Sequence, residues 1–216
     1  MNILLTAGAT REPIDSVRFL SNISSGATGA ALAERLAAAG HRVTLLHGEN
    51  AARPEAASGV SCTVFGSTEQ LGERLRAALA TGGFDVVIHA AAVSDYRPAM
   101  VSAEKLSSDA DGMKIQLVPT PKLLPQLRGW SPRPVRVVGF KLTTGANAAE
   151  RAVAVGKLFS RGGVDAVVQN DTAELSSAGA GRTFRLFVNG AEDTTADVVS
   201  GVTALGEWLV RWVNSR

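Results

Sequence analysis

The feature that most constrains the fold is a nearly continuous apolar run, FDVVIHAAA, at residues 84–92. A strand that is apolar at almost every position has both faces buried, which is typical of the parallel sheet of an α/β protein. Other apolar or alternating runs predict further strands, with helical patterns between them. These expected strands are residues 2–5, 41–46, 61–65, 135–140 and 165–169, followed by a late antiparallel strand at 183–188.

The alternation of strands and helices predicts a Rossmann-like, doubly wound α/β fold, with a mostly parallel sheet flanked by helices. The sequence contains no internal repeat and no clear linker, so we expect one domain over residues 1–216. Ser67 and Gln70 have the spacing of a capping box, and Asp197 is expected to cap the last helix. Expected helices cover 30–39, 68–80, 123–127, 146–161 and the segment from 198 to 213, and the alternating segment 114–118 predicts an edge strand or an arm.

Composition excludes several classes of partner. The formal net charge is +2, and no run of Lys or Arg is present, so there is no global attraction to nucleic acid or to an anionic membrane. No apolar run approaches the roughly 18 residues of a membrane span, and the first residues do not resemble a signal peptide. Cys62 is the only cysteine, which excludes internal disulfides and favours a reducing compartment, with the cytoplasm as the default.

The connection between the first strand and the first helix, residues 6–29, is unusually long. It takes about twenty residues, where connections of this kind usually take roughly two to six. It is rich in Thr, Ser and Asn, and it contains Gly8, Gly26 and Gly29. Because ordering so long a loop is entropically unfavourable, we expect it to bind a ligand.

The end of this loop has the chemistry of an anion site. Ser24, Ser25 and Gly26 precede the helix, whose first backbone N–H groups point outward at the positive end of its dipole. Phosphate is the most natural ligand for such a site. The alternative is that a serine caps the helix while the glycines only allow close packing.

Polar residues also follow the other parallel strands, and ligands of such sheets bind at the carboxyl ends of the strands. Lys105 and Lys141 could hold phosphate, although an exposed lysine is the common alternative. Asp95 could accept hydrogen bonds from a base or a ribose, or could be a turn residue. Asn22 could hold an acyl oxygen, or could make a loop hydrogen bond. Asn170 and Asp171, which end the strand at 165–169, could belong to the site or could equally form a turn.

The sequence shows no metal-binding motif. His41, His47, His89 and Cys62 have no ligand spacing, and His89 is expected to be a core histidine because it lies in the buried strand. The nucleophile elbow GxSxG is also absent. The identity of any metal ligands therefore stays unknown at this point.

Taken together, the loop segments resemble one family, phosphopantothenoylcysteine synthetase, also called phosphopantothenate–cysteine ligase, of coenzyme A biosynthesis. In many bacteria this enzyme is the second half of a protein that begins with a flavin-dependent decarboxylase, and here it would stand alone. The similar segments are ILLTAGATREPIDSVRFLSNISSGATGAALAE (3–34), HAAAVSDYRP (89–98), EKL (104–106), LVPTPKLL (117–124), VGFKL (138–142) and QND (169–171).

The resemblance implies a two-step reaction of 4′-phosphopantothenate, CTP and L-cysteine with Mg²⁺, through an acyl-cytidylate. It implies that Asn22 stabilises this intermediate and that Lys105 assists the attack on the nucleotide. It also implies a homodimer with the segment 114–118 as a contact. By the same resemblance, the substrate phosphate is held by Ser24, Ser25 and Gly26, and the nucleotide site is lined by Gly8, Ala90, Ala91, Asp95, Phe140 and Lys141.

Two rival hypotheses and one alternative nucleotide stay open. Many members of the family have a KxKK cluster where this chain has KLSS from Lys105, which would suit a non-catalytic relative that binds the same ligands. The FKL sequence at 140–142 resembles ATP-using members, so ATP is an alternative to CTP. An NAD(P)-dependent short-chain reductase would share the fold, but the only tyrosine, Tyr96, is followed four places on by Met100 rather than by lysine.

Overall fold

The computed structural model describes residues 1–107, 112–175, 181–189 and 196–215. Its centre is an eight-stranded sheet in the order β12-β11-β10-β9-β6-β1-β4-β5. The six strands from β10 to β5 are parallel, and β11 pairs antiparallel with both β10 and β12. The strands are β1 (Asn2–Ala7), β4 (Arg42–Gly48), β5 (Ser61–Phe65), β6 (Val86–His89), β9 (Arg136–Thr143), β10 (Ala166–Asp171), β11 (Thr183–Val188) and β12 (Asp197–Ser200).

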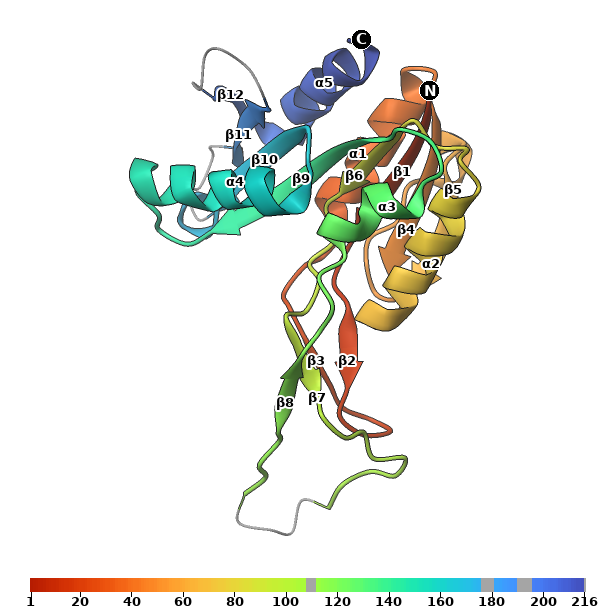
Figure 1. The fold of residues 1–216 in the computed structure, drawn as a ribbon, viewed down its shortest axis with the longest axis vertical. Helices are drawn as coiled ribbons and strands as arrows, with labels where there is room; N and C mark the ends of the chain where they lie inside the picture. The colour runs from red at the N-terminus through yellow and green to blue at the C-terminus, as the bar shows by residue number, and fades with distance from the viewer. Residues whose placement is uncertain (108–111, 176–180, 190–195, 216) are drawn as a thin grey trace.

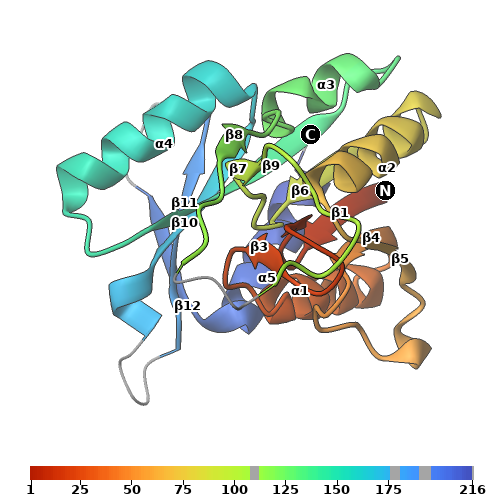
Figure 2. The ribbon, with the colours of Figure 1, turned by 90° about the horizontal axis from the view of Figure 1, so that it is seen from below.

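Helices cover both faces of this sheet, as Figure 2 shows from below. Helices α1 (Ala27–Ala38) and α5 (Gly201–Asn214) pack on one face, over a core that includes Leu5, Ile88 and the stacked Trp208 and Trp212. On the other face the core includes Leu4, Val87 and Val137. This face is covered by α2 (Thr68–Ala80), α3 (Leu127–Trp130) and α4 (Ala148–Gly162). The described chain also has three short 3-10 turns: η1 (Ala56–Ser58), η2 (Leu124–Gln126) and η3 (Thr172–Leu175).

Four short strands form an arm that leaves the sheet, at the bottom of Figure 1. Strand β2 (Arg11–Pro13) pairs with β3 (Phe19–Ser21), and β7 (Tyr96–Pro98) pairs with β8 (Leu117–Pro119). We call residues 11–23 and the described parts of 96–119 the arm.

Asp15 joins the two halves of the arm. Its carboxylate accepts hydrogen bonds from the backbone N of Val17, Arg18 and Leu106, at 2.9, 2.7 and 3.1 Å. Burial of the carboxyl group opposes ionisation, but these hydrogen bonds and the charge of Arg18 together lower the pKa of Asp15. The arm is therefore organised by a carboxylate that is ionised at neutral pH.

The structure confirms the predicted doubly wound sheet and the late antiparallel strand. The position of Gly29 also has a structural reason, since a Cβ there would overlap the side chain of Ala7, and α1 could not lie so close to β1. No helix in the described ranges is long and apolar enough to cross a membrane.

The segment 114–118 lies in the arm, which is one of its two predicted placements, and residues 117 and 118 are in β8. Three local predictions were wrong. The crossing at 6–29 is partly regular, because it contains β2 and β3, and α1 begins at Ala27 rather than at residue 30. Asp197 lies in β12, where it accepts from Trp208 Nε1 at 2.9 Å instead of capping α5. Ser67 does cap α2, but the Gln70 side chain accepts from Gly66 N, so the reciprocal bond of a capping box is absent at Ser67.

Candidate functional site

The predicted site residues follow strands that end at one edge of the sheet. The loops after β1 and β6 lie side by side there, because Gly8 O accepts from Ala92 N at 2.8 Å and Ala92 O accepts from Thr10 N at 3.2 Å. Strands β9 and β10 end at the same edge, with Lys141 opposite Gln169. The shared carboxyl-end edge that the sequence predicts is thus present.

The N-terminus of α1 has backbone donors without a partner inside the helix. Its N-cap is Gly26, in the left-handed conformation at φ 73°, and no side chain in the described ranges caps the helix. The Ser25 hydroxyl lies 3.4 Å from Ala27 N, at the outer limit of a hydrogen bond, so capping by serine does not explain this residue. Packing does explain Gly26, since a Cβ would crowd the side chain of Ala51. Apart from the weak contact of Ala27 N, the first backbone N–H groups of α1 have no partner within the helix and can bind an anion.

A residue that the sequence reasoning missed lies beside this turn. The Arg182 guanidinium is 3.2 Å from Thr28 Oγ1, in the first turn of α1. Within the described ranges Arg182 makes no ion pair, and the first turn contains no acidic residue. A cation at the positive end of a helix is unfavourable unless an anion accompanies it. No local sequence signal could reveal this contact, because 154 positions separate the two residues.

The loop after β6 is fixed by hydrogen bonds. Thr6 Oγ1 lies 2.9 Å from His89 Nδ1 and accepts from Ala91 N at 3.1 Å. Burial lowers the pKa of His89 to about 4, so the imidazole is neutral at pH 7 and behaves as the predicted core histidine. Ala90 and Ala91 are half-buried beside this network, and Asp95, which is exposed, forms an ion pair with Lys122.

Asn22 and Lys105 occupy different surroundings. The exposed Asn22 donates from Nδ2 to Val93 O at 3.2 Å, which places it beside the loop that carries Ala90, Ala91 and Asp95. This contact is also the loop hydrogen bond of the alternative interpretation. Lys105 is exposed in the arm, next to Leu106. The structure thus brings Asn22, but not Lys105, into direct contact with the loop after β6.

Lys141 lies on the α4 side of the edge. Together with Glu150, Val153 and Lys157 it lines a groove of about 460 Å³. The lining is largely apolar apart from the two lysines and Glu150, and Phe140, the preceding residue, is half-buried. Such a groove suits a ligand that carries an apolar part and a negative charge.

Asp171, at the end of β10, has a structural role. Its buried carboxylate accepts from Thr143 Oγ1 at 2.6 Å, Gly145 N at 2.7 Å and Ala146 N at 3.0 Å, and so fixes the loop between β9 and α4. The hydrogen bond from Thr143 is the largest cause that lowers the pKa of Asp171 far below 3.8. For Asp171, the alternative that residues 170–171 shape a turn and do not bind a ligand is therefore sufficient.

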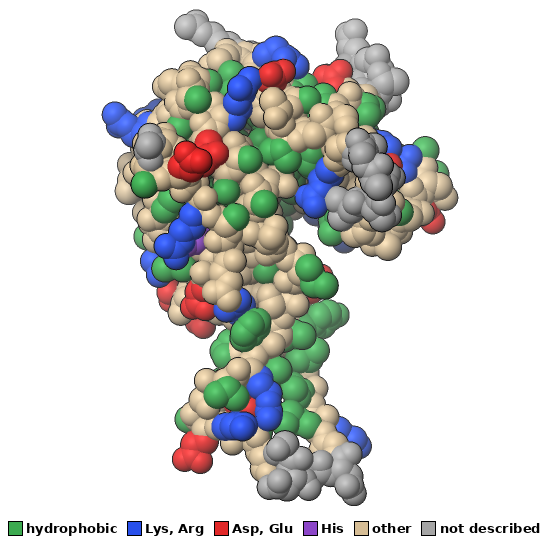
Figure 3. Space-filling model, turned by 180° about the vertical axis from the view of Figure 1, so that it is seen from behind, with side chains coloured by type: hydrophobic (Ala, Val, Ile, Leu, Met, Phe, Trp, Pro, Cys, Tyr) green, Lys and Arg blue, Asp and Glu red, His purple; other side chains and the backbone are tan. Residues whose placement is uncertain are grey.

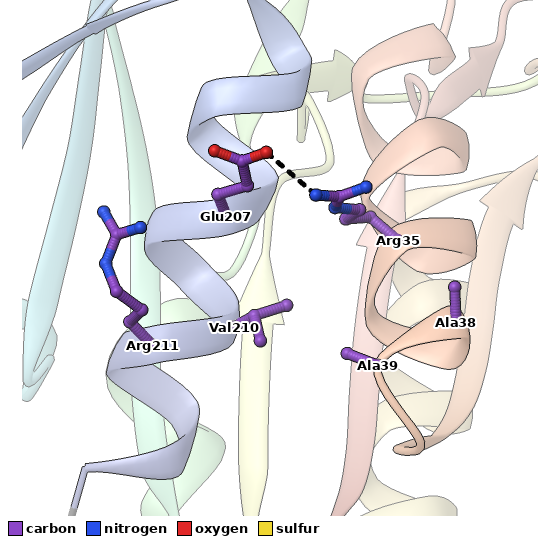
Figure 4. Close-up of a pocket in the computed structure, with 6 residues that line it drawn as sticks. All are labelled: Arg35, Ala38, Ala39, Glu207, Val210 and Arg211. Atoms are coloured by element: carbon purple, nitrogen blue, oxygen red, sulfur yellow. Dashed lines mark hydrogen bonds and ion pairs between the residues drawn. The ribbon is translucent and has the colours of Figure 1, made fainter.

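A second groove, of about 390 Å³, lies between α1 and α5. Figure 4 shows the Arg35–Glu207 ion pair across it, at 2.8 Å, with Val210 and Arg211 nearby. None of the predicted site residues lines this groove. In the part of the chain that the structure describes, no group of three or more His, Cys, Asp or Glu side chains is placed to hold a metal ion.

The fold and the placement of the loops define a Rossmann-like α/β protein with polar loops at the carboxyl edge of its sheet and an arm beside them. A family model described as "DNA/pantothenate metabolism flavoprotein C-terminal domain" matches residues 1–200. The chain belongs to this family.

Relatives agree with this assignment. The chain is 36% identical over 175 residues to the coenzyme A biosynthesis bifunctional protein CoaBC of Thermococcus kodakarensis, which covers 81% of this chain and 42% of the relative. It is 37% identical over 194 residues to CoaBC of Mycobacterium tuberculosis H37Rv, which covers 87% and 44%. The chain thus spans less than half the length of these relatives.

Solved structures show the same architecture. The DNA/pantothenate metabolism flavoprotein from Streptococcus pneumoniae superposes with a TM-score of 0.86 at 25% identity, over 99% of this chain and 98% of that one. Cab2, solved as an H337A mutant in complex with phosphopantothenate-cysteine, gives 0.80 at 19% identity, over 98% and 84%. At 19% identity, the similarity to Cab2 supports the fold alone.

Proposed function

We propose that this chain is a phosphopantothenate–cysteine ligase of coenzyme A biosynthesis. The observation that carries the proposal is the open N-terminus of α1, where Arg182 contacts Thr28, together with the hydrogen bond from Asn22, shortly before the helix, to the loop at 90–95. Such an arrangement suits a substrate that has a phosphate at one end and a reacting carboxylate at the other. Membership of the family and the names of the CoaBC relatives support the same substrate class.

In the proposed reaction, a carboxylate oxygen of 4′-phosphopantothenate attacks the α-phosphorus of CTP, and the bond to pyrophosphate breaks. The amine of L-cysteine then attacks the acyl carbon, the amide forms, the amine loses a proton, and CMP leaves. Ser24, Ser25 and Gly26, with Arg182, would hold the substrate phosphate. Asn22 would stabilise the acyl-cytidylate, as an uncharged amide can donate to a developing oxyanion.

The nucleotide would lie across the neighbouring strand ends. Gly8, Ala90, Ala91, Asp95, Phe140 and Lys141 would line its site, and Lys105 would assist the attack from the arm. The exposure of Lys105 and the groove that Lys141 shares with Lys157 support these roles, since triphosphate needs nearby cations. ATP is the alternative nucleotide.

Mg²⁺ is proposed to arrive with the triphosphate. Mg²⁺ is usually bound by one or two carboxylates and by substrate phosphates, and it neutralises charge on the transferring group. The described residues provide no cluster of acidic side chains for a protein-held ion. In this proposal the ion is therefore bound mainly through the phosphates of the nucleotide.

We also propose that the chain forms a homodimer through the arm. Apolar side chains are exposed along the arm, as the lower part of Figure 3 shows. A surface of this kind on an extended element usually marks a protein–protein contact. The exposed apolar residues of the arm are Val17, Phe19, Leu20, Ile23, Tyr96, Met100, Val101, Met113, Ile115 and Leu117.

The free, exposed Cys62 suits the cytoplasm, which we propose as the compartment.

A non-catalytic relative that binds the same ligands is the second candidate, favoured by the KLSS sequence from Lys105. The reductase hypothesis is not supported, because Tyr96 lies in β7 of the arm and the chain belongs to a different family.

The test is pyrophosphate release from CTP, 4′-phosphopantothenate and Mg²⁺ without cysteine, with ATP in a parallel reaction. Release that depends on 4′-phosphopantothenate, followed by amide formation when cysteine is added, is the expected result. Binding of both ligands without release would favour the non-catalytic relative.

A further inference from the structure

A buried polar cluster lies where the arm joins the sheet. Thr10, Glu12, Thr68 and Ser94 form it, and each is at most 4% exposed. One carboxylate oxygen of Glu12 accepts from the backbone N of Thr68 at 2.9 Å and from its hydroxyl at 2.6 Å. Because Thr68 is the first residue of α2, the carboxylate lies at the positive end of that helix, where negative charge is favoured. Glu12 thereby fixes the base of the arm to α2.

Thr10 is the centre of this cluster. Its Oγ1 accepts from Ser94 N at 3.0 Å and lies 3.2 Å from the Thr68 hydroxyl. Its backbone N donates to Ala92 O at 3.2 Å, and its backbone oxygen accepts from the Ser21 hydroxyl at 2.7 Å. One residue is therefore bonded to the strand that leads into the α1 loop and to the loop after β6.

These two segments carry the two halves of the proposed reaction. Ser21 precedes Asn22, which would act on the acyl group, and Ser94 precedes Asp95, which would contact the nucleotide. The Thr120 hydroxyl donates to Ser94 O, so the loop after β6 is held at Ser94 by both Thr10 and Thr120. Thr10 itself is 0% exposed and cannot touch a substrate.

We propose that Thr10 is a positioning residue, a proposal that rests on the proposed function. Thr10 sets the separation between the acyl and nucleotide subsites through its hydrogen bonds to Ser21 and Ser94. A reacting geometry depends steeply on such a separation. Misplacement by about 1 Å changes rates by about a hundredfold. Each substrate alone contacts only one of the two segments, so its affinity depends much less on their separation.

The test compares Thr10→Val, which removes the hydroxyl at nearly constant volume, with Thr10→Ser, which retains it. Ser21→Ala is a milder variant that removes the hydroxyl bonded to Thr10 O at 2.7 Å, which also lies 3.1 Å from Asn22 O. Thr44→Val, in β4 outside the cluster, is the matched control. For each folded variant, kcat for pyrophosphate release is measured, together with the Kd of CTP and of 4′-phosphopantothenate separately. Hydrogen–deuterium exchange of peptides covering 19–23 and 91–98 is measured on the same proteins without ligand.

We expect Thr10→Val to lower kcat by about ten- to a hundredfold while each Kd changes less than about threefold. Thr10→Ser should restore most of the rate, and Ser21→Ala should lower it by a smaller factor. Thr10→Val, which removes the acceptor of Ser94 N, should also speed exchange in the 91–98 peptide. Ser21→Ala, which breaks the bond to the Thr10 backbone oxygen, should speed exchange in the 19–23 peptide, and Thr44→Val should do neither.

Two results would overturn the assignment: rates within about twofold of wild type in both Thr10→Val and Ser21→Ala, or Kd values that worsen as much as kcat, which indicates a structural role only. If the wild-type chain releases no pyrophosphate, the proposed function fails by itself. The exchange data then decide on Thr10. Faster exchange of 91–98 in Thr10→Val and of 19–23 in Ser21→Ala supports the coupling, and unchanged exchange in either variant contradicts it.

Discussion

At the scale of single residues, Asn22 has the sharpest expected effect. Its amide donates to Val93 O, so an Asn22→Asp variant would lose a donor and place a negative charge beside a developing oxyanion. We expect the cysteine step to slow by about a hundredfold, while the Kd of CTP changes little. Single-turnover formation and decay of the acyl-cytidylate separates the two. An equal loss of nucleotide binding and of the cysteine step would contradict the role.

Arg182 gives a second prediction at this scale. Hydrogen bonds to a charged group contribute about 1.5–3 kcal/mol, so Arg182→Gln should raise the KM for 4′-phosphopantothenate by about ten- to a hundredfold. The KM for CTP should stay unchanged. Arg42→Gln, at the opposite edge of the sheet where β4 begins, is the matched control. The preference over pantothenate, which lacks the phosphate, should fall in the Arg182 variant only, and a preserved preference would remove Arg182 from the site.

At the scale of elements, Asp171 stabilises the loop between β9 and α4. Its folded-state pKa is lowered below the ordinary 3.8, so its contribution to stability is present above about pH 4 and is lost as the pH falls further. Asp171→Asn should therefore lower the urea midpoint of unfolding at pH 7, and the midpoint should then depend less on pH in the acid range. Urea unfolding between about pH 3 and pH 7 measures both effects. Glu73→Gln, on the exposed side of α2, should change neither.

The same scale shows what the sequence could predict. Strands β1, β4, β6, β9 and β10 were predictable because both of their faces are buried, which leaves long apolar runs in the sequence. Strands β2, β3 and β7 are three residues each, too short for any period to show. Asp197 was misplaced because an acidic residue before an apolar pattern looks the same in the sequence whether it caps a helix or begins a strand, as it does in β12.

For the site, sequence reasoning reached the loops but not the contacts between them. Glycine and serine before a helix predict an anion site from local chemistry alone, which is why Ser24, Ser25 and Gly26 could be named. Arg182 and Thr10 depend on partners far away in the chain, and their type gives no hint of those partners. Glu12 is similar. Nothing in the sequence tells that this glutamate is buried against the first residue of α2 and not exposed to solvent.

At the scale of the whole molecule, the arm predicts the oligomeric state. Two chains of 22.4 kDa should sediment as one dimer at micromolar concentration, because the exposed apolar side chains of the arm would be buried against a second copy. Burial of apolar area stabilises by about 25 cal/mol per Å², so charging this surface should separate the chains. The double variant Ile115→Asp with Leu117→Asp, at 39% and 44% exposure, should sediment as a monomer. Its unfolding midpoint at high dilution should match that of diluted wild type.

Val198→Asp is the matched control for this experiment, because Val198 is 61% exposed on β12, outside the arm. It should leave the dimer intact, and its unfolding midpoint shows what an added charge does to an exposed strand position. Sedimentation velocity over a range of concentrations, together with pyrophosphate release, links assembly to activity. A wild-type chain that stays monomeric at all concentrations would refute the dimer. A monomeric double variant with full activity would instead show that each chain holds a complete site, and that the arm contributes to assembly alone.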